Sequence, residues 1–119
     1  ANRLVRDLPE GANLILDIVD PLEDQSRARY RSFLNELQTH MVNTGGLAVL
    51  HAMKGGDPPN RELTAHMAYV VFDLETERKG SEIVNRLSVP KFRGGRALDE
   101  TIKLKLTEQV SVDTSRDIA

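Results

Sequence analysis

The sequence predicts an α/β fold with a mixed sheet, in which a parallel βαβ unit is followed by an antiparallel meander. Two observations lead to this prediction. In the first half of the chain, short and continuously apolar runs flank one long stretch of helical periodicity, as the strands and crossover helix of a parallel unit do. In the second half, apolar and polar residues alternate, which is the pattern of antiparallel strands. The 119 residues suit one domain, and we expect a single domain over residues 1–119.

The first half contains the segments expected to form the βαβ unit. The nearly continuous apolar run at residues 13–19 predicts a strand covered on both faces. Apolar residues then recur at steps of three and four over residues 23–44, which predicts an amphipathic helix. We expect Glu23 near the start of this helix, where the helix dipole favours acids, and Gly45 at its end. Residues 46–53 predict a second buried strand, joined to the first by a right-handed crossover.

The second half contains the segments expected to form the meander. Residues 54–62 are rich in Gly and Pro and predict a loop, followed by a short helical turn. From Tyr69 the period changes to two, which predicts a strand, and residues 77–82 predict the turn of a hairpin. Residues 83–90 alternate as its second strand, and residues 101–112 alternate again as one closing strand.

Composition excludes several classes of protein and site. The net charge of −2 argues against bulk electrostatic attachment to nucleic acid, so we do not expect a nucleic-acid partner. There is no cysteine, which excludes disulfides and Cys-based zinc sites and is in keeping with a cytoplasmic location. No apolar run approaches the roughly 20 residues of a membrane span, so we expect none. The histidines and acids lack the usual spacing of metal ligands, and we expect no metal site.

Two acids and one histidine follow the predicted parallel strands. Asp17 ends the first strand, at the edge where α/β sheets place ligands, and Asp20 lies three residues later. In P-loop nucleotide hydrolases an Asp at this place holds Mg²⁺ directly or through water. Alternatively, Asp17 and Asp20 begin a polar loop and cap the helix. His51 ends the second strand and is a weaker candidate, either to polarise water or sense a γ-phosphate, or as a structural residue.

A phosphate-binding loop of the P-loop type is not present in this sequence. That motif requires G-x-x-x-x-G-K-[ST], because backbone N–H groups wrap the phosphates while Lys and a hydroxyl reach phosphate and metal. None of the Gly pairs 45–46, 55–56 and 94–95 is followed by Lys-Ser or Lys-Thr. A nucleophile elbow is also missing. We therefore expect no catalytic residue and no cofactor for this chain alone.

Two cations flank Phe92 at a predicted strand end. Because strand side chains alternate, Lys91 and Arg93 should project to the same side, just before the Gly94–Gly95 pair. An Arg fork binds phosphate bidentately, and Lys adds a point charge. The alternative is a solvated basic edge that discourages pairing between sheets.

Taken together, these segments resemble the C-terminal half of a RecA-superfamily ATPase core of the KaiC, RadA and GvpD-like type, and are most similar to haloarchaeal HTR-like proteins. The resemblance covers about residues 10–112, and its most specific part is "SVPKFRGG" at residues 88–95, similar to the family's "hxKhRG" strand end. It implies that Asp17 matches the metal-associated acid of the Walker B strand. It also implies that Lys91 and Arg93 match cations that reach a neighbour's γ-phosphate across a subunit interface. ATP and Mg²⁺ are thereby implied for a longer parent protein.

The sequence also departs from this family, and two functions remain open. The family's glycine-rich loop and catalytic Glu lie upstream of the segments present here, and Tyr69 stands where relatives commonly carry Asp. We favour a non-catalytic regulatory, signalling or assembly domain; the alternative is the C-terminal part of an active ATP-hydrolysing domain whose Lys91 and Arg93 act in trans. A partial core leaves sheet edges and faces uncovered, so we expect a homo-oligomer, with a signalling protein as a further candidate partner. DNA binding, known among RadA-like relatives, is disfavoured because aromatic surface for base stacking is scarce.

Overall fold

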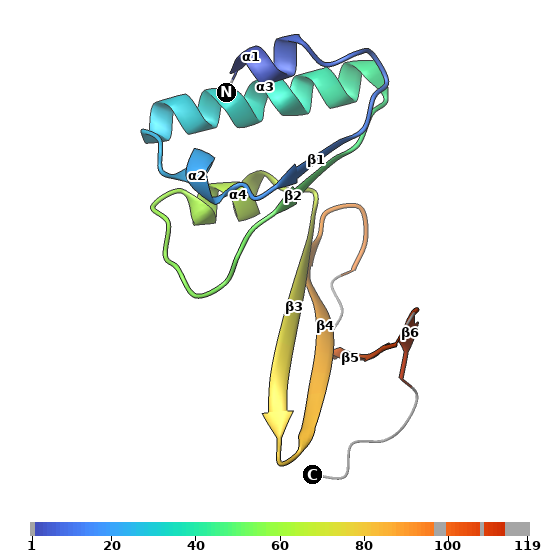
Figure 1. Cartoon of the computed structure of the whole chain (residues 1–119). Helices are drawn as coiled ribbons and strands as arrows, with labels where there is room; N and C mark the ends of the chain where they lie inside the picture. The colour runs from blue at the N-terminus through green and yellow to red at the C-terminus, as the bar shows by residue number, and fades with distance from the viewer. Residues whose placement is uncertain (1, 97–99, 108, 114–119) are drawn as a thin grey trace. The chain divides into compact units, whose positions relative to one another are not determined.

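The computed structural model describes residues 2–96, 100–107 and 109–113, and divides the chain into two compact units (Figure 1). The first unit is Ala1–Met67 and the second is Ala68–Ala119. Each unit is described by itself below. Whether the two units behave as the single domain expected from chain length stays a prediction.

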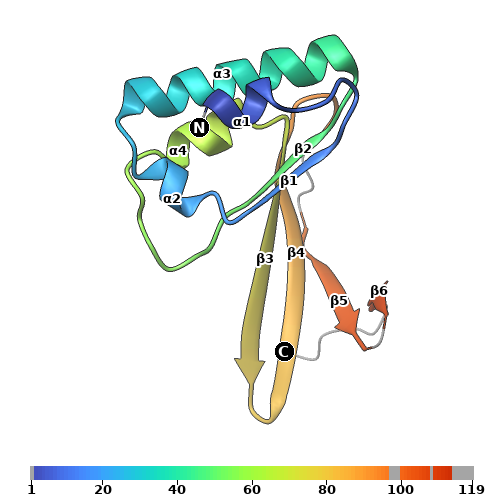
Figure 2. The ribbon, with the colours of Figure 1, turned by 45° about the horizontal axis from the view of Figure 1, so that its top comes forward.

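The first unit contains the predicted parallel βαβ arrangement. Strands β1 (Leu14–Asp17) and β2 (Ala48–His51) pair in parallel, with Leu14 opposite Ala48 and Asp17 opposite His51. Figure 2 shows the two strands running side by side, and both strands end at the same level. Burial alternates along each strand, and Ile15 and Val49 are exposed. The expectation of strands covered on both faces is therefore wrong within this unit, because one face alone packs against the helices.

The predicted helix over residues 23–44 begins later in the structure, at Arg27, and a separate short helix ends at Glu23. Helix α2 (Asp20–Glu23) ends before Ser26, whose side chain accepts a hydrogen bond from Arg29 N and caps α3 (Arg27–Thr44). Glu23 therefore does not face the start of the long helix; it is buried at the end of α2. The end of α3 is as predicted: Gly45 adopts a left-handed φ of 79°, and its N–H donates to Met41 O.

The core of the first unit is the apolar stripe that the sequence predicts. All five stripe residues are buried: Tyr30, Phe33, Leu34, Leu37 and Met41. They pack with Val5 of α1 (Asn2–Arg6), Val19, and Leu63 of α4 (Arg61–Met67). Helix α1 has no counterpart among the predicted elements, and it lies along α3 in both views of the chain (Figures 1 and 2).

The second unit is the predicted antiparallel meander. Strands β3 (Val70–Lys79), β4 (Glu82–Phe92), β5 (Ile102–Leu106) and β6 (Val110–Val112) pair in that order. The predicted closing strand at residues 101–112 is β5 and β6, because the chain turns where Thr107 N donates to Gln109 O. A bulge between Val71 and Asp73 interrupts the simple alternation expected along β3.

These elements confirm the predicted fold class, α/β with a parallel βαβ unit followed by an antiparallel meander. The strands form two hydrogen-bonded sheets rather than one mixed sheet: β1 and β2 pair with each other, and β3 to β6 pair among themselves. Among the described residues, none of the helices combines the length and the apolarity that crossing a bilayer requires.

Strand pairing gives the meander one mainly apolar face, which also carries the Thr76–Asn85 pair, and one mainly charged face, on which the buried Val84 lies opposite Glu77. Opposed pairs such as Leu74 with Leu87 and Leu104 with Val112 place their side chains on the same side of the sheet. The apolar face of the meander comprises Leu74, Ile83, Leu87, Ile102, Leu104, Leu106, Val110 and Val112. On the other face, Arg86 pairs with Glu77 at 3.7 Å.

Candidate functional site

Asp17 and His51 meet where the two parallel strands end. They are opposite each other in the strand register, and Asp17 Oδ1 lies 2.6 Å from His51 Nδ1. Both side chains are largely exposed, at 66% for Asp17 and 54% for His51. The sequence placed each residue at a strand end but did not indicate that they bond to each other. One carboxylate oxygen of Asp17 is thus engaged by an imidazole.

Asp20 is held by protein groups on both of its oxygens. Its Oδ1 accepts from Met53 N at 3.1 Å, and its Oδ2 accepts from Arg61 Nη2 at 3.0 Å. The residue begins α2, but Val19 is the N-cap of that helix and no side chain caps it. Asp20 therefore ties the loop after β2 to α4 instead of capping the helix, and its expected association with a metal or nucleotide stays a prediction.

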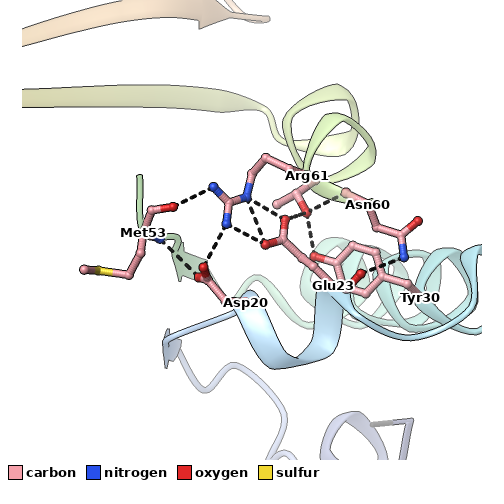
Figure 3. Close-up of polar contacts among 7 residues, drawn as sticks. Asp20, Glu23, Tyr30, Met53, Asn60 and Arg61 are labelled. Carbon is pink, nitrogen blue, oxygen red and sulfur yellow. Dashed lines mark hydrogen bonds and ion pairs between the residues drawn. The ribbon is translucent and has the colours of Figure 1, made fainter. Parts of the chain in front are cut away.

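Arg61 is the centre of a polar network in the first unit (Figure 3). Its Nε lies 2.9 Å from each carboxylate oxygen of Glu23, and its Nη1 donates to Met53 O at 2.8 Å. Glu23 is completely buried, with 0% exposure. Hydrogen bonds to Glu23 are the largest cause that raises the pKa of Arg61, and the charges of Glu23 and Asp20 act in the same direction. One guanidinium thus offsets two carboxylates.

Three further side chains complete this network. Thr64 Oγ1 donates to Glu23 Oε2 at 2.6 Å, and Tyr30 donates to Thr64 Oγ1 at 2.7 Å. Asn60 Nδ2 lies 2.8 Å from Glu23 O (Figure 3) and 2.7 Å from Gln25 O. Burial is the largest cause that raises the pKa of Tyr30, so its hydroxyl keeps the proton that this chain of bonds requires.

The sequence interpretation missed this network because it assigned residues 54–62 to a loop. Arg61 in fact opens α4, directly after Asn60. Asn is a favoured residue immediately before a helix, so the pair Asn60–Arg61 was the available signal for an earlier helix start. The partners of Arg61 could not be read from local pattern, since Glu23 lies 38 residues away in the chain.

The first unit therefore offers limited metal-binding chemistry at its strand ends. Each oxygen of Asp20 is engaged by a protein group, and the Arg61 guanidinium lies 3.0 Å away. Within residues 2–96, 100–107 and 109–113, no group of three or more His, Asp or Glu side chains is placed to hold a metal ion. Of the three residues predicted at the strand ends, Asp17 and His51 are exposed and bond to each other.

Lys91 and Arg93 belong to the second unit, and the structure brings them together. Lys91 is opposite Val71 on β4, and Arg93 N donates to Tyr69 O at 2.9 Å just beyond the strand. Partial burial, and secondly the positive charge of Arg93, lower the pKa of Lys91. Arg93 Cζ lies 5.8 Å from the centroid of the Tyr69 ring. The sequence predicted the shared side of the two cations, but not the contact with Tyr69.

Comparisons with known proteins identify a family and a fold. The whole chain, residues 1–119, matches the family described as "Family of unknown function (DUF7125)", and the chain belongs to that family. No curated protein matches it. Among solved structures, it is similar to the crystal structure of a KaiC-like protein from the hyperthermophilic archaeon Pyrococcus horikoshii OT3, with 17% identity and a TM-score of 0.65. The match covers 85% of this chain and 48% of that one, so the chain spans about half the length of the KaiC-like protein.

At this low identity the likeness shows the fold alone. It confirms the KaiC-like, RecA-type scaffold that the sequence resembles.

Proposed function

We propose that this member of the DUF7125 family is a regulatory or assembly domain that uses a KaiC-like scaffold without hydrolysing nucleotide itself. The observation that carries the proposal is the state of Asp20, whose two oxygens bond to Met53 N and Arg61. We also propose that it is related to the HTR-like proteins of haloarchaea and that its role lies in signalling.

The network explains why Asp20 is poorly suited to nucleotide chemistry. A Mg²⁺ ion at Asp20 would have to displace Arg61, because one cation repels the other at this distance. Displacing Arg61 would also leave the buried Glu23 carboxylate without its cation, which costs about 3–5 kcal/mol. The acids at this position therefore stabilise the fold, and Asp17 alone remains exposed to ligands.

Assembly is supported by the apolar face of the meander. Several of its side chains are well exposed, including Leu74 at 62% and Val110 at 70%. Contiguous apolar surface on a sheet is typical of sites that bind another protein. We propose that a second copy of the protein or a signalling partner covers part of this surface.

Turnover by the full-length natural protein tests the proposal. Phosphate release from ATP is measured with and without Mg²⁺, for the wild type and for Asp17→Asn and Asp20→Asn variants. We expect no Mg²⁺-dependent release from any of the three. Release that requires Mg²⁺ and is abolished by Asp17→Asn would show that the strand-end acid serves catalysis, and would overturn the proposal.

A second candidate function is favoured by the proximity of Lys91 and Arg93. In this alternative the chain is the C-terminal part of an ATP-hydrolysing assembly, and the two cations contact the γ-phosphate bound by a neighbouring subunit. Strand alternation supports this alternative, because Lys91 and Arg93 are two residues apart at the end of β4 and can face one anion. If this alternative holds, the ATPase rate of the assembled protein falls in the Arg93→Gln variant. The rate stays unchanged in the nearby control variant Arg96→Gln.

A further inference from the structure

We propose that Tyr69 is a positioning residue that holds the guanidinium of Arg93 beside Lys91. Nothing in the family match or the structural likeness assigns a role to Tyr69. Tyr69 and both cations belong to the second unit. The link from Tyr69 to phosphate contacts rests on the second candidate function above.

Strand pairing places Tyr69 and the two cations on one face. Val70 is opposite Phe92 and Val71 is opposite Lys91, so the next pair outward is Tyr69 with Arg93. The bond from Arg93 N to Tyr69 O, at 2.9 Å, shows that this pairing continues beyond the end of β4. Side chains at alternate positions share a face, so Tyr69 and Val71 lie on the same side as Lys91 and Arg93.

The ring of Tyr69 contacts the charged end of Arg93. The 5.8 Å separation of Arg93 Cζ from the ring centroid lies within the range of cation–π attraction. This attraction opposes the repulsion between Arg93 and Lys91, which is the second cause, after burial, that lowers the pKa of Lys91. The ring therefore contributes to keeping the guanidinium of Arg93 near Lys91 despite their like charges.

The glycine turn after Arg93 makes room for this ring. A Cβ atom on Gly94 would lie 2.9 Å from Tyr69 Oη and 3.2 Å from Tyr69 Cε1, so any larger residue would displace the ring. A Cβ atom on Gly95 would instead lie 3.1 Å from two ring atoms of Phe92. The two adjacent glycines therefore provide a matched pair of variants, one directed at Tyr69 and one at Phe92.

Nuclear magnetic resonance of the full-length natural protein tests the positioning directly. Protons of Arg93 that lie over an aromatic ring are shifted upfield, and the pKa of Lys91 reports the distance of the Arg93 charge. We expect Tyr69→Phe to retain the Arg93 shift, and Tyr69→Leu and Gly94→Ala to lose most of it and to raise the pKa of Lys91. Gly95→Ala should retain most of the shift. Unchanged Arg93 protons and an unchanged Lys91 pKa in Tyr69→Leu would overturn the proposal.

A titration with inorganic tripolyphosphate separates this proposal from the function on which its relevance rests. If the two cations act together on phosphate, Tyr69→Leu should weaken tripolyphosphate binding roughly three- to tenfold, and Tyr69→Phe should restore it. Wild-type protein that shows the Arg93 shift but binds no tripolyphosphate would refute the trans contact while supporting the positioning role. Tripolyphosphate binding that is equally strong in wild type and Tyr69→Leu would count against Tyr69.

Discussion

Replacing Arg61 with methionine removes the cation that faces two carboxylates while keeping much of the side-chain volume. Glu23 has no exposure to solvent, and both of its oxygens lie 2.9 Å from Arg61 Nε. Thr64 continues to donate to Glu23 in the variant, but a hydroxyl does not neutralise the charge. The variant therefore retains a buried, hydrogen-bonded carboxylate that has lost its ion-pair partner.

The expected loss of stability follows from burial. Removing one member of a buried ion pair costs about 3–5 kcal/mol, a large share of the roughly 5–15 kcal/mol that holds a typical domain folded. Urea unfolding followed by the circular dichroism of the helices measures this loss, since every described helix lies in the first unit with Arg61. The midpoint should fall steeply, and a fraction of Arg61→Met protein should be unfolded even without urea.

Two controls separate this cause from general damage. Arg27 of α3 pairs with Glu62 of α4 at 3.1 Å, but the side chains are 51% and 76% exposed. Arg27→Ala should cost no more than about 1 kcal/mol. The double variant Glu23→Gln with Arg61→Met should recover a large part of the single variant's loss, because it leaves no buried charge.

Similar small losses for Arg61→Met and Arg27→Ala would refute this reasoning. Glu23 would then not be a buried charge that depends on Arg61, and the structural role given to Asp20 would fail with it.

Three further predictions concern other residues of the two units. Asn60→Ala should cost about 1–3 kcal/mol in the same urea assay, because the buried carbonyl of Glu23 and the partly buried carbonyl of Gln25 lose their donor. A change within error would contradict these bonds. Arg93→Gln should raise the pKa of Lys91 toward its ordinary value of 10.5 in an NMR titration, and an unmoved pKa would mean that the charges lie apart. The pKa of Tyr30 is raised above 10.0, so the folded state keeps a proton that the unfolded state loses, and stability should fall as the pH rises above about 10. Tyr30→Phe should lack this part of the fall when both proteins are unfolded by urea across that range.

Elements with strong local patterns were predictable from the sequence. The stripe from Tyr30 to Met41 repeats with helical period, and the same period buries it against neighbouring elements. Gly45 ends the helix because a left-handed φ of 79° suits glycine. Of the candidate site, the positions of Asp17 and His51 at strand ends followed from the short apolar runs that precede them.

Features set by tertiary contacts were not predictable in this way. A continuous apolar run suggested coverage of both strand faces. Ile15 is exposed, however, because the helices contact only the other face of the strand. The alternation of residues 101–106 and 110–112 was interpreted as one strand, although the three polar residues at 107–109 interrupt it at the place where Thr107 N donates to Gln109 O. Arg61 is one of several arginines in the sequence, and its role arises from Glu23 and Asp20, which lie 38 and 41 residues away.

Sedimentation velocity of the full-length natural protein, at micromolar concentration with ATP and Mg²⁺ present, tests the proposed assembly function most directly. A KaiC-like scaffold that acts by assembly should sediment as a dimer or larger species. Its distribution of sedimentation coefficients should stay constant over time, because no ATP is consumed. A protein that remains entirely monomeric under these conditions, or whose assemblies dissolve as the nucleotide is hydrolysed, would contradict the account.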